Sequence, residues 1–279
     1  MIREILVSEV EQAVQKLLVE AAYRLPEDYL AALRRARDQE VSELGRSILA
    51  TLLDNADYAA LEKIPTCQDT GMVILQLALG QDVHVIGGNL NQALEHAVRM
   101  AYQGLRKSVV KDPLLRENTG DNTPPIVYYK VVPGDKLQIT ALMKGFGAEM
   151  MSALRMLPPS AGVEGVKQFV LEIVERAGPN ACPPIIVGVG VGSSFDGVAH
   201  LAKQALMRPI GQPNVLPHLA QLEQELLERI NALGIGPQGL GGCFTALSVH
   251  IESYPTHIAA LPVAVNLNCS APRRATVVI

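Results

Sequence analysis

The four cysteines of this chain all lie in segments rich in glycine, proline and small polar residues. Such segments form turns, whereas a cysteine that serves as a small core hydrophobe is expected inside an apolar, periodic segment. A thiolate on a turn can point at a ligand, so this placement predicts a metal centre. The positions are Cys67, Cys182, Cys243 and Cys269.

The spacing of the cysteines restricts the kind of centre. Intervals of 115, 61 and 26 residues exclude the compact paired spacing of zinc fingers and zinc ribbons. Three thiolates from separate loops would suit a 4Fe–4S cluster whose fourth iron is left open as a Lewis acid. Spacing alone leaves this hypothesis and that of scattered structural cysteines equally open.

Length and composition exclude several classes of protein. With 279 residues the chain can bury a large core, and it contains no apolar run of 18 residues. Its N-terminus opens an amphipathic segment instead of a signal peptide, so we expect a cytoplasmic protein without a membrane partner. A net charge of −4, with 4% aromatic residues and no tryptophan, gives no surface for nucleic acid.

Hydrophobic periodicity predicts helices over residues 1 to about 63, with Ser8 and Glu11 as a capping box. Further helices are expected over 89–109, 163–177, 196–207 and 219–233, and strands over 71–80, 126–132, 136–143, 185–191, 245–253 and 259–267. The turn at 133–135 predicts that 126–132 and 136–143 form a hairpin. We expect the apolar residues 276–279 to be buried against another surface.

Helices and strands alternate without a fixed period, which predicts a mixed α/β (α+β) fold. We expect a single domain, 1–279, with a helical N-terminal segment, 1–63, and a mixed-sheet body, 64–279, that carries the cysteine loops. The glycines of 234–239 match the letters of a dinucleotide fingerprint but follow a helix, which excludes a Rossmann site. The glycines of 188–192 lie between a predicted strand and a predicted helix. We expect them to allow tight packing of the strand, in preference to binding an anion.

Two polar residues near the cysteines are candidates for chemistry. Asp69 lies two residues after Cys67, so a ligand loop would carry it towards whatever the thiolate binds. His257 lies twelve residues before Cys269 at the predicted start of a strand, where its ring could face a site. A lone histidine is more often structural, and this interpretation stays open beside the functional one.

Six ordered motifs together resemble the iron–sulfur hydro-lyases of the class I fumarase and L-tartrate dehydratase family, over essentially the whole chain. The chain is more similar to the separate α subunit of the two-subunit members than to single-chain members, which carry an additional C-terminal domain. The motifs are Cys67-Gln-Asp-Thr-Gly71, Glu117-Asn-Thr-Gly120, Lys144-Gly-Phe-Gly-Ala-Glu149, Asn180-Ala-Cys-Pro-Pro184, Gly236-Pro-Gln-Gly-Leu-Gly-Gly242 and Pro262 through Ala271.

The resemblance implies that Cys67, Cys182 and Cys269 hold an oxygen-sensitive 4Fe–4S cluster and leaves Cys243 without that role. It implies that a separate β subunit, in an α2β2 complex, supplies the remaining cations and the general base. The sequence Pro-Thr-His-Ile at 255–258 departs from the Pro-Arg-His-Gly of single-chain fumarases. The implied substrate and catalytic contacts are Gln68, Asp69, Arg106, the glycine loop from Gly145 to Gly147, and His257.

The activity implied is reversible hydration of fumarate to (S)-malate. Asp69 would deliver a proton to the departing oxygen, and Arg106 would bind a carboxylate of the small dicarboxylate substrate through two hydrogen bonds. Dehydration of L(+)-tartrate is the alternative substrate chemistry, and a catalytically silent iron–sulfur scaffold subunit is the alternative class. The presence of Cys67, Asp69 and Arg106 together argues against the scaffold.

Overall fold

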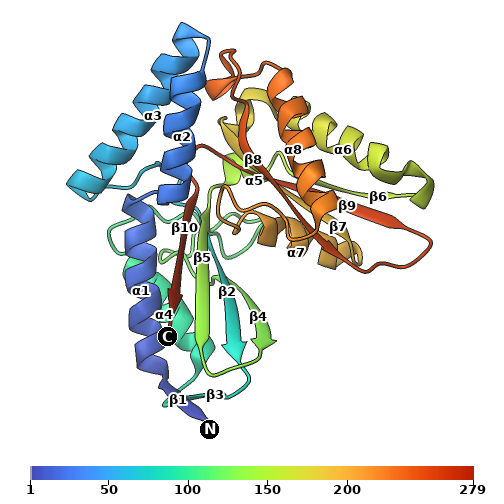
Figure 1. The fold of residues 1–279 in the computed structure, drawn as a ribbon. Helices are drawn as coiled ribbons and strands as arrows, with labels where there is room; N and C mark the ends of the chain where they lie inside the picture. The colour runs from blue at the N-terminus through green and yellow to red at the C-terminus, as the bar shows by residue number, and fades with distance from the viewer. Residues whose placement is uncertain (1) are drawn as a thin grey trace. The chain divides into compact units, whose positions relative to one another are not determined.

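The computed structural model describes residues 2–279 and divides the chain into two compact units, each with a mixed β-sheet and helices (Figure 1). Unit 1 comprises the residues up to Pro26, Ala56–Phe146 and Pro272–Ile279. Unit 2 comprises Glu27–Asn55 and Gly147–Ala271. The predicted mixed α/β class is confirmed, whereas the single domain with a boundary at residue 63 stays a prediction. No described helix is both long and apolar enough to cross a membrane.

Unit 1 is built on a four-stranded sheet in the order β10-β5-β2-β4. Strand β2 runs parallel to β4 and antiparallel to β5, which is antiparallel to β10. A small parallel pair, β1 and β3, lies beside this unit's first helix. The strands are β1 (Arg3–Leu6), β2 (Met72–Gly80), β3 (Val83–Ile86), β4 (Ile126–Val132), β5 (Leu137–Lys144) and β10 (Arg273–Val278).

Alternation along the strands places the core of unit 1. Val73, Leu75 and Leu77 of β2 are fully buried and share one face of the sheet. Helices α1 (Val7–Tyr23) and α4 (Leu90–Ala101) pack in the same cluster through apolar residues at helical spacing, such as Val14 and Leu94. Asn89 caps α4, because its side chain accepts a hydrogen bond from the backbone of Gln92.

Five local predictions fail in this unit. The segments 126–132 and 136–143 are strands but not a hairpin, because β2 lies between β4 and β5. The apolar residues 276–279 were expected to be buried against another surface, but they continue β10 and pair with β5. Ser8 lies inside α1, which begins after Leu6, and α4 ends at Ala101 instead of reaching residue 109. Residues 3–6 form a strand within the predicted helical segment.

Unit 2 contains a second four-stranded sheet, in the order β6-β9-β7-β8. Strand β7 runs parallel to β8 and antiparallel to β9. The elements of this unit are α2 (Glu27–Gln39), the first part of α3 (Glu43–Glu62), most of the short α5 (Phe146–Glu149), β6 (Ala153–Leu157), η1 (Pro159–Ala161), α6 (Gly162–Ala177), η2 (Gly178–Ala181), β7 (Ile185–Gly192), α7 (Phe195–Ala205), α8 (Pro217–Ala232), η3 (Pro237–Gly239), β8 (Ala246–Tyr254) and β9 (Leu261–Asn268).

The glycines of β7 explain how helices cover both faces of this sheet. Val187 and Val189 enter the core shared with α6 and α8. On the other face a Cβ at Gly188 would lie 2.4 Å from the carbonyl oxygen of Ala202, and one at Gly190 would lie 2.2 Å from that of Val198. Both carbonyls belong to α7, so the glycines allow the helix to pack against the strand. The expectation of tight packing at these glycines is confirmed.

Candidate active site

The first group of predicted site residues lines one pocket of unit 1, with a volume of about 430 Å³. Gln68 and Asp69 come from the loop before β2, and Arg106 comes from the segment after α4. Gln68 and Arg106 are exposed, whereas Asp69 is half-buried. The other lining residues, which the sequence analysis did not select, are Lys107, Ser108 and Asn118.

The carboxylate of Asp69 has a fixed orientation. Its Oδ1 accepts a hydrogen bond from the backbone N–H of Gly71 at 2.9 Å, and its Oδ2 accepts one from that of Phe146 at 2.8 Å. Tyr102, fully buried below this loop, donates its hydroxyl to the carbonyl oxygen of Thr70 at 2.8 Å. Burial, partly offset by Arg273 and reinforced by Asp69, raises the pKa of Tyr102 far above its usual range, so the phenol stays a donor.

The Arg106 segment is held by two asparagines. Asn122 is fully buried, and its Oδ1 accepts hydrogen bonds from the backbone N–H groups of Ser108 at 2.7 Å and Val109 at 3.2 Å. Asn118 donates to the carbonyl oxygen of Lys107 at 3.0 Å. Because this segment turns instead of continuing α4, it presents Arg106 and Lys107 to the pocket.

A buried arginine lies behind Asp69. A Cβ built on Gly145 would be 3.1 Å from Asp69 Oδ2 and 3.3 Å from Nη2 of Arg273. Arg273 is 1% exposed, and its Nε has no hydrogen-bond partner among residues 2–279. The bare glycine therefore lets a cation and the candidate catalytic carboxylate approach the same point. Sequence analysis missed Arg273, because nothing local distinguishes it from its neighbour Arg274.

Asp121, on the loop that carries Asn118, predicts a pH effect on stability. Burial alone would raise its pKa, but hydrogen bonds from Thr123 and Arg99 and the charge of Arg99 lower the pKa to about 2, from a usual 3.8. Since the folded-state pKa is depressed, the stabilisation is present above about pH 3.8 and is lost as the pH falls towards about 2.

We expect Asp121→Asn to lower the free energy of unfolding by about 1 kcal/mol at pH 7, a modest amount because solvent screens this partly exposed carboxylate. Between pH 4 and pH 2 the variant should lose less stability than the parent. Urea unfolding at each pH measures the difference. Asp135→Asn, at an exposed turn before β5, controls for net charge. Equal pH dependence in the parent and Asp121→Asn would contradict the assignment.

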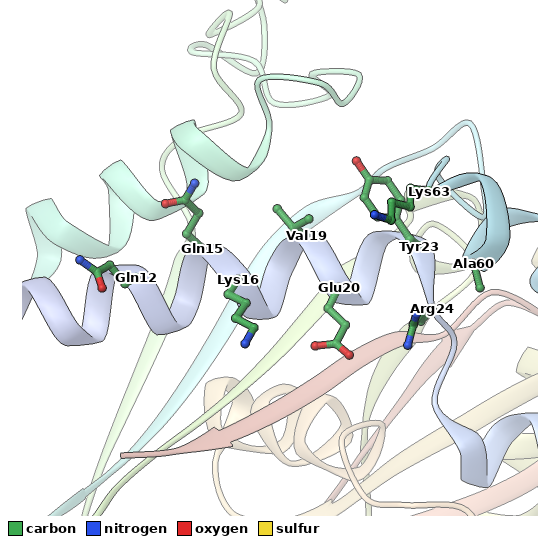
Figure 2. A pocket seen from close by; sticks show the side chains of 9 residues that line it. All are labelled: Gln12, Gln15, Lys16, Val19, Glu20, Tyr23, Arg24, Ala60 and Lys63. Atoms are coloured by element: carbon green, nitrogen blue, oxygen red, sulfur yellow. The ribbon is translucent and has the colours of Figure 1, made fainter.

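Figure 2 shows a larger pocket of unit 1, about 580 Å³, that runs along α1. Lys16, Glu20 and Arg24 lie along the helix, and Lys63 approaches from the segment after α3. None of the residues selected from the sequence lines it. The smaller pocket around Asp69 is therefore the candidate site, and the larger one supplies positions for control substitutions.

Two of the three predicted cluster cysteines belong to unit 2, where their loops touch. The backbone N–H of Ser270, which follows Cys269, donates to the carbonyl oxygen of Cys182 at 3.0 Å. The hydroxyl of Tyr29 on α2 donates to the carbonyl oxygen of Ser270 at 2.7 Å. Burial, with a smaller contribution from Cys269, raises the pKa of Tyr29 far above its usual range, so this hydroxyl also stays a donor.

The third predicted ligand, Cys67, belongs to unit 1. Within either unit, the described residues contain no group of three or more His, Cys, Asp or Glu side chains placed to hold a metal ion. All four cysteines are thiols and not disulfides. Iron–sulfur clusters are bound by cysteine thiolates, so Cys182 and Cys269 have the chemistry to supply two of the ligands of such a cluster.

Three further predicted positions lie outside these groups. Cys243, which the resemblance left without a role, is exposed, and its backbone N–H donates to the buried Glu40 at 2.9 Å. Gly147 belongs to unit 2 and lies inside the short helix α5. His257 is exposed on the loop between β8 and β9, and its Nδ1 accepts from the backbone of Ala259 at 3.2 Å. Among the described residues of unit 2, no hydrogen bond joins His257 to either cysteine loop.

One pocket thus contains a fixed carboxylate, an exposed arginine and a lysine, and comparison with known proteins shows the family to which the chain belongs. The family model described as fumarate hydratase (fumerase) matches residues 11–278. The chain belongs to this family of hydro-lyases.

Curated relatives align over nearly the full length. The putative L(+)-tartrate dehydratase subunit alpha of Methanocaldococcus jannaschii is 42% identical over 274 residues, which cover 95% of this chain and 96% of the relative. The L(+)-tartrate dehydratase subunit alpha of Escherichia coli O157:H7 is 37% identical over 282 residues, covering 96% and 92%. The corresponding protein of Escherichia coli K12 is 36% identical over the same length and shares.

Proposed function

We propose that this chain is the α subunit of an iron–sulfur hydro-lyase that removes water from a hydroxy-dicarboxylate, with L(+)-tartrate as the first candidate substrate. The pocket that joins Asp69 to Arg106 and Lys107 carries the proposal, because it combines a proton-transfer group with two cations. The names of the relatives favour tartrate over the fumarate hydration expected from the sequence. Fumarate stays the second candidate because the family model carries its name.

The residues of the pocket divide the work of dehydration. Arg106 can bind one carboxylate through two parallel N–H···O bonds, and Lys107 adds a point charge. The amide of Gln68 can donate to the substrate hydroxyl. Asp69, held at both oxygens, faces the pocket in one orientation and can hand a proton to the departing oxygen.

We propose that Cys67, Cys182 and Cys269 are the ligands of a 4Fe–4S cluster. When bound, such a cluster supplies a Lewis-acidic iron that lacks a protein ligand. The proposal is supported by the turn placement of the three thiols and by the contact between the Cys182 and Cys269 loops. His257 is proposed as a further contact to substrate, on the family resemblance alone.

A separate β subunit completes the proposed enzyme, which we place in the cytoplasm as an α2β2 complex. The curated relatives are themselves named as alpha subunits. Permanent complexes of this kind bury more than roughly 2,000 Å². The apolar C-terminal residues no longer support the partner, since they pair within unit 1.

Turnover by the anaerobically co-produced complex tests the substrate assignment. L(+)-tartrate and fumarate are supplied side by side, and kcat/KM is compared. Higher kcat/KM for tartrate supports the first candidate, and the reverse order assigns the fumarate reaction. Turnover of neither substrate would contradict the proposed function, and full activity from this chain alone would contradict the need for a partner.

Arg106→Gln tests the pocket itself. It removes a charged hydrogen-bonding group, so kcat/KM for the better substrate should fall about 10- to 100-fold, mainly through KM. Lys63→Gln removes a cation from the larger pocket of unit 1 and is the matched control. Equal effects of the two substitutions would place substrate binding elsewhere.

A further inference from the structure

One side-chain amide joins the two cysteine loops of unit 2. Gln238 lies in the turn η3 between α8 and β8, and both its backbone N–H and its Nε2 donate to the carbonyl oxygen of Pro183, at 2.8 and 2.7 Å. The same Nε2 is 3.2 Å from Oγ of Ser270. Pro183 directly follows Cys182, and Ser270 directly follows Cys269. A single residue therefore spans the segments that carry two predicted cluster ligands.

Ser270 is held at three of its atoms. Its N–H donates to Cys182, its carbonyl oxygen accepts from Tyr29, and its hydroxyl accepts from Gln238. Tyr29 is 1% exposed on α2, so its end of the network is anchored in the core of unit 2. These contacts fix the Cys269 loop to the Cys182 loop from two sides.

The backbone at this junction adopts costly conformations. Gln238 has φ of +52° and Cys182 has φ of +53°, in the left-handed region that residues other than glycine seldom occupy. Next to Gln238, a Cβ on Gly239 would lie 2.3 Å from Cβ of Pro179, so only glycine permits the close approach of η3 to the turn before Cys182. Strained residues persist where the surroundings over-determine them, and such places are enriched at functional sites.

We propose that Gln238 is a positioning residue whose amide sets the separation and orientation of the Cys182 and Cys269 thiols, so that both can ligate one iron–sulfur cluster. The inference rests on the proposed function and assigns a role to the glycine-rich motif at 236–242. Mutation of a residue that holds a metal ligand in place commonly lowers metal affinity about tenfold or more. If Gln238 only stabilised the turn, its replacement would lower the stability of the fold without changing the separation of the two thiols.

Gln238→Asn in the full-length chain separates these roles. Asparagine tolerates the left-handed backbone, but its amide is one methylene shorter and cannot reach both loops. Gln212→Asn, at an exposed loop position of the same unit, is the matched control. After anaerobic reconstitution with iron and sulfide, we expect iron to pass from Gln238→Asn to a chelator about tenfold faster than from the parent or the control.

The apoprotein provides a measurement that needs no cluster. In a background of Cys67→Ser and Cys243→Ser, only Cys182 and Cys269 remain as thiols. Dibromobimane becomes strongly fluorescent when it bridges two nearby thiols. We expect bridging in the parent background to be several-fold faster than with Gln238→Asn added, while the thermal midpoints of the two apoproteins agree within a few degrees.

The outcomes are distinguishable. Unchanged iron release and unchanged bridging in Gln238→Asn would overturn the inference, as would a large fall in thermal midpoint with unchanged bridging. If the parent takes up no iron but Gln238→Asn still slows bridging, the pairing of the loops stands and the proposed cluster falls. If Gln238→Asn fails to fold, Ser270→Ala removes only the hydroxyl acceptor, and unaltered iron release and bridging there would likewise overturn the inference.

Discussion

Replacing Cys67, Cys182 or Cys269 with Ser should abolish the brown absorption of the anaerobically purified protein, whereas Cys243→Ser should leave it unchanged. A cubane cluster held by three thiolates cannot spare one, because serine is a poor ligand for its iron. The parent and Cys243→Ser should each contain about four irons and four sulfides per chain. Iron and sulfide analysis with visible spectra of the four variants makes the comparison.

The structure sharpens the choice of Cys243 as the control. Its loop is held by Glu40, which is buried and accepts the backbone N–H groups of Cys243 and Phe244 at 2.9 and 3.2 Å. Those bonds use the backbone, so Cys243→Ser should leave the loop intact. A colourless Cys243→Ser protein beside a brown Cys269→Ser protein would overturn the ligand assignment. Retention of full cluster content by all four variants would likewise overturn the ligand assignment, and a parent protein that holds neither iron nor sulfide would overturn the cluster itself.

The secondary structure was predictable where the signal is local. Helices α6 and α8 and strands β2 and β7 lie within a few residues of the ranges expected from periodicity. Strand pairing was not predictable in the same way. The turn at 133–135 correctly reverses the chain, yet β2, from more than 40 residues earlier, takes the place beside β5. Pairing depends on which apolar faces complete the core, and no local window contains that information.

The candidate site likewise contains residues that a local motif predicts and residues that only the tertiary structure brings in. Cys67, Gln68 and Asp69 are adjacent in sequence, so one motif finds all three. Lys107 and Asn118 enter the pocket only because the chain turns after α4 and returns, a path that periodicity had extended as helix to residue 109. Arg273 reaches Gly145 and Asp69 through the pairing of β10 with β5, which the sequence did not reveal.

Asp69→Asn should lower kcat by roughly 10²-fold or more while the cluster content stays unchanged, because it removes the transferable proton. The structure shows that this substitution also has a local cost. Each carboxylate oxygen of Asp69 accepts a backbone N–H, from Gly71 and from Phe146, whereas an amide offers only one oxygen. Its Nδ2 must then face a donor, which disfavours the observed turn.

A second substitution separates the lost proton from the disturbed turn. Asp121→Asn, in the same unit, likewise replaces a carboxylate that accepts from the backbone, at Thr123, but lies outside the pocket lining. We expect both variants to lose stability, which urea unfolding measures, and only Asp69→Asn to lose the rate. If Asp69→Asn with its full iron content turned over at a near-normal rate, Asp69 would be a turn former and proton transfer would belong to another residue.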